Sequence, residues 1–209
     1  GCTDGGMLPI ECNYLWVVYN LLDPSHVALV HVTSFAGSGT DSAPLDMEKT
    51  DLGVIVSRWI YDQPASPYYK DLVRFAGNCD RKQHYEMSVP AIALNKSIYT
   101  PIGTGGPDAA PVAETYVNIS YNLMTPVDEH NTQYIWFQQR NTDPTEKAIS
   151  EKMNAGAVMA FNEDKEILEA VQKGMDAMIT PNIDLGLDLG AKTFRLKLQR
   201  LIDTEQADV

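Results

Sequence analysis

Cysteine and histidine are both scarce in this chain of 209 residues, which has three cysteines and four histidines. Cys2, Cys12 and Cys79 are an odd number of thiols, and their spacing is not that of a metal-binding pair. A framework of disulfides is therefore not indicated. We interpret the three residues as free thiols of a protein in the reducing cytoplasm.

Basic residues are also in deficit, since 16 Lys and Arg against 28 Asp and Glu give a formal net charge of −12. This balance argues against binding to nucleic acid or to an anionic membrane surface, because both need a basic patch. The chain lacks an apolar run of about 18 residues, which a transmembrane helix requires. Its first residues have neither the basic region nor the apolar core of a signal peptide. We expect one cytoplasmic domain over residues 1–209.

The pattern of residues changes about two thirds of the way along the chain. Aromatic and β-branched residues predict strands first, and a helical period with Ala, Glu, Lys and Met follows over 144–178. A second amphipathic helix is predicted over 188–205, with Phe194, Leu198 and Leu201 on one face. Strands followed by long helices predict an α+β fold. The expected strands are 13–19, 51–61, 81–89, 91–99, 114–124 and 133–140, with a loop over 33–50.

Two of the four histidines lie in the segment Asn20-Leu-Leu-Asp23-Pro-Ser-His26-Val-Ala-Leu-Val-His31. Asp23 as N-cap and Pro24 in the first turn predict a short helix. Side chains five apart on a regular helix point about 140° from each other, so both imidazoles can face one ion only if the helix distorts or ends between them. Zinc proteases place their histidines four apart with a Glu after the first, and that motif is absent. The spacing leaves a metal site and a structural hydrogen-bonded pair both open.

The pattern Asn-x-x-Asp-x-x-His-x4-His resembles the mononuclear-iron motif of the Rieske non-haem iron oxygenases. From Glu11 to His31 the sequence is most similar to the vanillate O-demethylase and dicamba monooxygenase branch of that family. A strand with Thr132-x-Tyr-x-Trp…Arg140 and a helix with Asp164 extend the resemblance over almost the whole chain.

The resemblance implies a role for each polar residue of the motif. His26 and His31 would be iron ligands, and Asn20 would lie beside the iron. Asp23 would link the iron site to a Rieske cluster in a neighbouring subunit by hydrogen bonds through His26. Tyr19 departs from the family, in which many members have Asp at this position. The departure concerns the hydrogen bonds around the ligands and not the ligands themselves.

Iron held by two histidines needs a carboxylate to complete a facial triad with open positions. The segment 161–169 holds four carboxylates, and composition alone makes most of them a solvated helix face. Family members carry Glu-Asp-Lys or a similar sequence here, which implies that Asp164 is the ligand. Glu163 and Glu166 would then point away. The helix would be buried through Ile167, Leu168 and Val171.

A Rieske [2Fe–2S] cluster needs two Cys and two His. None of the four histidines lies in a Cys-x-His or Cys-x-x-His pair, so this chain cannot house the cluster. Residues 1–209 are therefore expected to be the mononuclear-iron catalytic domain without the N-terminal Rieske domain, the cluster belonging to that missing domain or to a partner subunit. The fold implied is a helix-grip (Bet v1-like or START-like) fold, in which a curved antiparallel sheet grips a long C-terminal helix.

The activity implied by the resemblance is an O2-dependent oxidation at a two-histidine, one-carboxylate Fe(II) site. It would be the O-demethylation or methyl hydroxylation of a small aromatic acid. Electrons would come from NADH through a reductase component. The full-length protein is expected to be a homotrimer, and the isolated fragment to trimerise weakly or not at all.

Polar residues Asn118, Ser120 and Asn122 share one face of the strand predicted over 114–124, by the period of two. They form either a solvent-facing side or a polar lining of the substrate cavity. His84 is interpreted as a surface or core histidine in a strand, and His130 as a solvated residue in a turn.

Two rival functions remain at this point. One is a hydrolase that uses zinc at a His-His-Asp site with a metal-bound water. The other is a ligand-binding module of the same helix-grip architecture, without catalysis. Metal content and oxygen dependence separate the oxygenase from the first, and an intact metal-binding triad separates it from the second.

Overall fold

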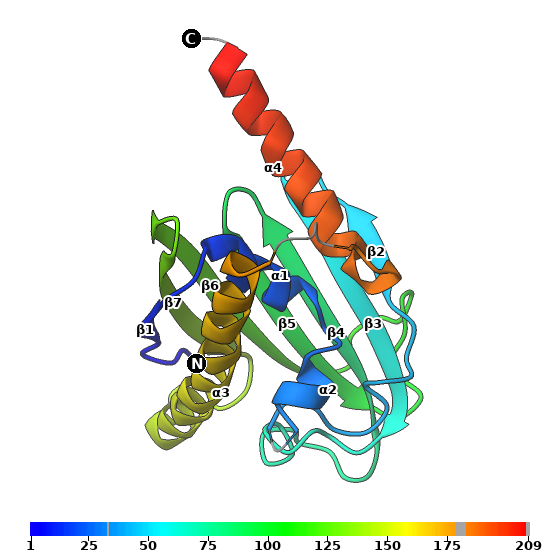
Figure 1. Ribbon diagram of the computed structural model, residues 1–209. Helices are drawn as coiled ribbons and strands as arrows, with labels where there is room; N and C mark the ends of the chain where they lie inside the picture. Colours follow the sequence, from blue (N-terminus) through cyan, green and yellow to red (C-terminus); the bar gives the residue numbers. More distant parts are fainter. Residues whose placement is uncertain (33, 179–182, 208–209) are drawn as a thin grey trace.

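The computed structural model describes residues 1–32, 34–178 and 183–207. Within these ranges, seven strands form one antiparallel sheet in the order β1-β7-β6-β5-β4-β3-β2 (Figure 1). The order means that consecutive strands from β2 to β7 are neighbours, and that the first strand closes the far edge beside the last. The strands are β1 (Gly6–Ile10), β2 (Asp46–Lys49), β3 (Gly53–Gln63), β4 (Cys79–Ser88), β5 (Ile92–Pro101), β6 (Tyr116–Asp128) and β7 (Asn131–Arg140).

The helices lie on one face of the sheet (Figure 1). In the described ranges they are α1 (Tyr14–Leu22), α2 (Val27–Val30), α3 (Lys147–Asp176) and α4 (Leu189–Ala207), with a 3-10 turn at Gly186–Asp188. Helix α1 contacts β4, β5 and β6 at the centre, α3 contacts β1, and α4 contacts β3 and β2. The α+β fold with a gripping antiparallel sheet is therefore confirmed, and α1, α3 and α4 all contact this face. No helix of the part described reaches the length and apolar character that crossing a membrane needs.

The strand expected over 13–19 is wrong, because these residues begin helix α1. Its aromatic and β-branched residues favour a strand, but the buried ones recur with a helical period. The side chain of Asn13 accepts a hydrogen bond from the backbone N–H of Leu15, which caps the first turn. Tertiary burial thus outweighs intrinsic propensity here. The buried residues of α1 are Val17, Val18, Leu21 and Leu22.

The five other expected strands are present as β3 to β7, with ends that differ by a few residues. Two short edge strands were not expected. Strand β1 contains Pro9, and β2 lies inside the segment expected to be a loop over 33–50. Proline and charged residues are typical of sheet edges, where they prevent pairing with other chains, and they hide a strand from pattern-based prediction.

Alternation along β6 decides which residues face the helices. Every second residue from Tyr116 to Met124 is buried, and the residues between them are half-buried on the opposite face. The core between sheet and helices also holds Phe194 and Leu198 of α4, which are buried as expected. Leu201, which shares one helix face with these two residues, is 50% exposed. Figure 1 shows the reason, since the end of α4 projects beyond the sheet.

The burial of two cysteines gives a testable difference in thiol reactivity. All three cysteines are free; Cys12 and Cys79 are fully buried, and Cys2 is exposed. Burial raises the pKa of Cys12 to about 12 and that of Cys79 to about 11. Because the thiolate is the reactive form, iodoacetamide at pH 8 is expected to modify Cys2 alone on the folded chain. Mass spectrometry should find one adduct on the folded chain and three in denaturant. Two adducts before unfolding would contradict this prediction.

Candidate metal centre

The two histidines of the motif flank a helix of four residues. His26 immediately precedes α2 and His31 immediately follows it. The backbone N–H of His31 still bonds the carbonyl of Val27 at 3.2 Å, and the chain then leaves the helix. Because the helix begins after one ring and ends before the other, the rings meet, with their centroids 5.2 Å apart. Two histidines five residues apart can thus face one site, because the helix between them ends at the second histidine.

The turn before α2 differs from the expected helix start. Asp23 ends α1, and Pro24 lies in the turn between the helices. The Asp23 carboxylate accepts a hydrogen bond from the backbone N–H of Ser25 at 2.9 Å and another from the Ser25 hydroxyl. It therefore stabilises a turn, and its assignment as the N-cap of a helix carrying both histidines is wrong.

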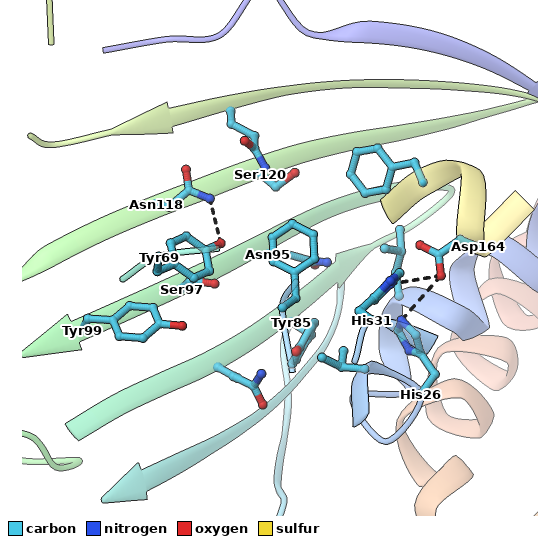
Figure 2. A pocket seen from close by; sticks show the side chains of 16 residues that line it. His26, His31, Tyr69, Tyr85, Asn95, Ser97, Tyr99, Asn118, Ser120 and Asp164 are labelled. Carbon is cyan, nitrogen blue, oxygen red and sulfur yellow. Dashed lines mark hydrogen bonds and ion pairs between the residues drawn. The ribbon is translucent and has the colours of Figure 1, made fainter. Parts of the chain in front are cut away.

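Asp164 of α3 completes a cluster with the two imidazoles (Figure 2). Its Oδ1 lies 3.2 Å from Nε2 of His31 and 3.7 Å from Nε2 of His26. One nitrogen from each ring and one carboxylate oxygen all lie within 4.8 Å of one another. Ligand atoms bound about 2.1 Å from a single ion are separated by about 3 Å or slightly more. The three side chains are therefore placed as ligands of one metal ion could be.

The chemistry of these side chains also fits a divalent cation. Asp164 is 7% exposed, and its Oδ1 accepts no hydrogen bond from the described residues. An ionised carboxylate in such a place is unfavourable unless a cation compensates it. Burial lowers the pKa of His26, which favours the neutral imidazole that binds metals. For His31 burial also acts to lower the pKa, but Asp164 and Glu163 outweigh it and the net shift is upward.

The second nitrogen of each imidazole has its own hydrogen-bond partner. Nδ1 of His26 bonds the backbone carbonyl of Asp23, and Nδ1 of His31 bonds Oε2 of Glu163 at 2.9 Å. The expectation that Glu163 points away is wrong. Asp164 approaches Nε2 of His31 from α3. Glu163, the residue before it, has a longer side chain that reaches Nδ1 on the opposite side of the same ring. Glu166 is exposed, as expected.

Aliphatic residues of α3 divide between the core and a surface groove. Leu168 is buried at 4% exposure, whereas Ile167 and Val171 are 43% and 37% exposed, so their predicted burial is wrong. Ile167 and Val171 line a groove between α1, α3 and α4. The same groove contains the motif residues Asn20 and Asp23.

His26 lines both this groove and the internal cavity, so the metal cluster lies between the two. Asp23 contacts His26 through its backbone carbonyl and not through its carboxylate, which Ser25 engages. The expected hydrogen bond from His26 to the Asp23 carboxylate is therefore not made. Asn20 lies on the groove side of the cluster and does not line the cavity.

The cavity beneath the cluster lies between the helices and the inner face of the sheet. The space between these elements is about 650 Å³, part of it open to solvent. Figure 2 shows His26, His31 and Asp164 at one end and Asn118, Tyr69 and Tyr99 at the other. None of the described lining residues is Lys or Arg. The other polar lining residues are Gln83, Tyr85, Asn95, Ser97, Ser120 and Gln138.

The three polar residues predicted on β6 are all buried, so the solvent-facing interpretation is wrong. Asn118, Ser120 and Asn122 are 1%, 7% and 1% exposed. Asn118 and Ser120 line the cavity. Asn122 lies deeper and accepts a hydrogen bond from the Tyr134 hydroxyl at 2.7 Å, so it does not line the cavity. Oδ1 of Asn118 accepts no hydrogen bond from the described residues and is free for a ligand.

A buried arginine, which no sequence motif marks, joins the cavity wall to the turn before α2. Arg58 donates through Nε to Oε1 of Gln83 at 2.6 Å and through a terminal nitrogen to the carbonyl of Pro24 at 3.0 Å. Because Arg58 donates to its oxygen, the Gln83 amide is oriented so that its N–H groups stay available to a ligand.

The other histidines lie away from the cluster. His84 is on the outer face of the sheet and contacts Glu86 at 3.2 Å, and His130 is exposed in the turn between β6 and β7. Both interpretations made from the sequence are consistent with these positions.

Comparison with known proteins gives close sequence relatives. Residues 10–204 match the family of the vanillate O-demethylase oxygenase C-terminal domain. A putative toluene-4-sulfonate monooxygenase iron-sulfur subunit from Comamonas testosteroni is 34% identical over 210 residues, covering 97% of this chain and 60% of the relative. A vanillate O-demethylase oxygenase subunit from a Pseudomonas species is 28% identical over 208 residues, covering 97% and 58%.

The same fold occurs in a solved structure. The crystal structure of dicamba monooxygenase bound to 3,6-dichlorosalicylic acid superposes with a TM-score of 0.86 at 21% identity, covering 97% of this chain and 59% of that one. The chain thus spans about three fifths of the length of these relatives.

Proposed function

Because the chain belongs to the family of vanillate O-demethylase oxygenase C-terminal domains, we propose that it is the mononuclear-iron catalytic domain of a Rieske-type aromatic monooxygenase. The observation that carries this proposal is the cluster of His26, His31 and Asp164 at one end of a partly enclosed cavity. Two imidazoles and one carboxylate on one side of an ion leave its other positions open, which is the ligand set of non-haem Fe(II) oxygenases.

In this proposal the three side chains hold Fe(II), which supplies the oxidation chemistry with O2 when bound. The reaction is the removal or hydroxylation of a methyl group on a small aromatic acid. An O-demethylation consumes O2, two electrons and two protons, and it releases a phenol, formaldehyde and water. The cavity orients the ring so that its methyl group faces the metal end and excludes most bulk water from that end.

The polar end of the cavity would bind the acidic group of the substrate. Amide N–H groups can hydrogen-bond a carboxylate or sulfonate without a lysine or arginine. Arg58 engages the oxygen of Gln83 and not its N–H groups, and Asn118 keeps the Nδ2 hydrogen that it does not donate to Tyr69. Asn118 and Ser120 are proposed to contact the substrate, and Asn122 to support them from behind through its hydrogen bond with Ser120 at 3.1 Å.

Electron delivery is proposed to occur on the groove side of the cluster. A Rieske [2Fe–2S] cluster, carried by an N-terminal domain of the full-length protein, would dock from a neighbouring subunit of a homotrimer beside Asp23. A reductase component would supply electrons from NADH. Three free thiols support a location in the reducing cytoplasm.

A direct test is turnover of the full-length protein with its reductase, NADH and O2 on a panel of methoxybenzoates. We expect formaldehyde in proportion to NADH consumed when the protein is loaded with Fe(II), and none when it is loaded with Zn(II). Activity with zinc and without O2 would instead support the hydrolase.

The polar end of the cavity makes a separate prediction. Asn118→Ala removes one hydrogen-bonding group, and losses of this kind are typically about 1 kcal/mol. We expect KM for the preferred methoxybenzoate to rise roughly five- to tenfold, with the iron content unchanged. Asn162→Ala, on the exposed side of α3, is the control and should behave as the wild type. An unchanged KM in Asn118→Ala would remove this residue from the substrate site.

A further inference from the structure

The Nδ1 atoms of the two imidazoles contact groups of different charge. Both Nε2 atoms face Oδ1 of Asp164, so both Nδ1 atoms are left for other partners. His26 uses a neutral backbone carbonyl for this purpose, whereas His31 uses the carboxylate of Glu163 at 2.9 Å. An ionised carboxylate only accepts hydrogen bonds, so with a metal ion on Nε2 this contact would hold the remaining ring proton on Nδ1 of His31.

Helix α3 therefore contacts His31 on both of its ring nitrogens with two consecutive residues. Asp164 lies 3.2 Å from Nε2, and Glu163 lies 2.9 Å from Nδ1. The His31 side chain is 5% exposed and that of Glu163 is 33% exposed, so the ring is buried while the carboxylate remains partly hydrated. A ring held at both ends by one helix cannot rotate without breaking a contact to that helix.

We propose that Glu163 is the positioning residue that fixes the tautomer and orientation of His31 and strengthens it as a metal ligand. This rests on the proposed function, since it assumes that the cluster binds a metal. Carboxylates that hydrogen-bond a ligating imidazole raise its basicity, and their loss typically weakens metal binding about 10- to 100-fold. His31 would then be the stronger of the two imidazole donors.

The competing explanation is an ordinary surface ion pair, which contributes little because it is hydrated and mobile. Such a pair would leave metal affinity unchanged when the charge is removed. A purely structural role would instead lower the stability of the metal-free chain without altering the ligand field of a bound metal. Metal affinity therefore separates the proposal from a surface ion pair. The ligand field of the bound metal separates it from a purely structural role.

The test uses Co(II), which binds sites of nitrogen and oxygen ligands more tightly than Fe(II) and has visible absorption bands that report its ligands. Co(II) is titrated into the chain and into Glu163→Gln and Glu163→Ala. Glu166→Gln is the matched control, because it removes the same charge three residues along the same helix from an exposed side chain. The melting temperature of each metal-free variant is measured in parallel.

We expect the Co(II) dissociation constant to rise about 10- to 100-fold in Glu163→Ala. A smaller rise is expected in Glu163→Gln, whose amide oxygen can still accept the hydrogen bond. Both should shift the visible bands, and Glu166→Gln should do neither. Wild-type affinity and bands in both Glu163 variants, or a weaker affinity explained by a lower melting temperature with unchanged bands, would overturn the proposal. Failure of the wild type itself to bind Co(II) would contradict the metal site and not the role of Glu163.

Discussion

Replacing Asp164 with Asn is expected to abolish Fe(II) binding at micromolar metal concentrations while leaving the chain folded. The carboxylate is the only anionic member of the cluster, and an amide is a poor ligand for Fe(II) in its place. The loss should exceed the roughly 10- to 100-fold effect of removing a group that only supports a ligand. The measurement is iron content after anaerobic reconstitution and desalting, which should fall from about one ion per chain to near zero.

His26→Ala should weaken metal binding in the same way, and His84→Ala is its control. His84 is half-buried on the outer face of the sheet, so its replacement tests whether any histidine has this effect. Stoichiometric iron in His26→Ala would remove His26 from the ligand set, and loss of iron in His84→Ala would point to a different site.

Asp23→Asn is expected to stop turnover of the full-length enzyme while keeping its iron. The hydrogen bond to His26 comes from the backbone carbonyl of residue 23, which asparagine retains. The negative charge in the groove is lost, and with it the pairing to a protonated imidazole of the neighbouring cluster domain that we propose for electron delivery. We expect a reducible cluster, at least about 80% of the wild-type iron, and NADH-driven product formation lowered by about two orders of magnitude or more.

Two outcomes would contradict this role for Asp23. Full activity of Asp23→Asn would show that its charge is not needed. Loss of iron as severe as in Asp164→Asn would show that residue 23 supports the metal ligands and has no separate task. Ser25→Ala serves as a control, because it removes one of the hydrogen bonds that hold the carboxylate but leaves the charge in place.

The sheet could be predicted from the sequence because its central strands alternate cleanly. Residues 117 to 123 alternate between apolar and polar side chains, and this signal is present without any tertiary information. Helix α1 could not be predicted in this way, because Tyr14–Leu22 is rich in residues that favour strands and becomes helical through burial against the sheet. Edge strand β2, with sequence Asp-Met-Glu-Lys, has no strand-like pattern of its own and is defined only by its pairing with β3.

The candidate site divides in a similar way. His26, His31 and Asp164 could be named in advance because a sequence motif marks them, and the structure brings them together. The contact of Glu163 with His31 spans 132 residues of chain and depends on the rotation of α3, which composition does not encode.

The lining residues on the neighbouring strands were missed because no motif marks them. Tyr85 on β4 and Asn95 on β5 lie opposite each other in the sheet. Only the register between two strands brings such residues to one cavity. The buried Arg58 was missed for the same reason, since its partners lie on three separate segments.

The central claim is that His26, His31 and Asp164 together bind one Fe(II). The most direct measurement is anomalous scattering at the iron absorption edge from crystals of the chain loaded with Fe(II) without oxygen. One peak is expected, within bonding distance of Nε2 of His26, Nε2 of His31 and a carboxylate oxygen of Asp164. A peak elsewhere in the chain, or fully loaded crystals in which any of these three groups lies beyond bonding distance, would contradict the account.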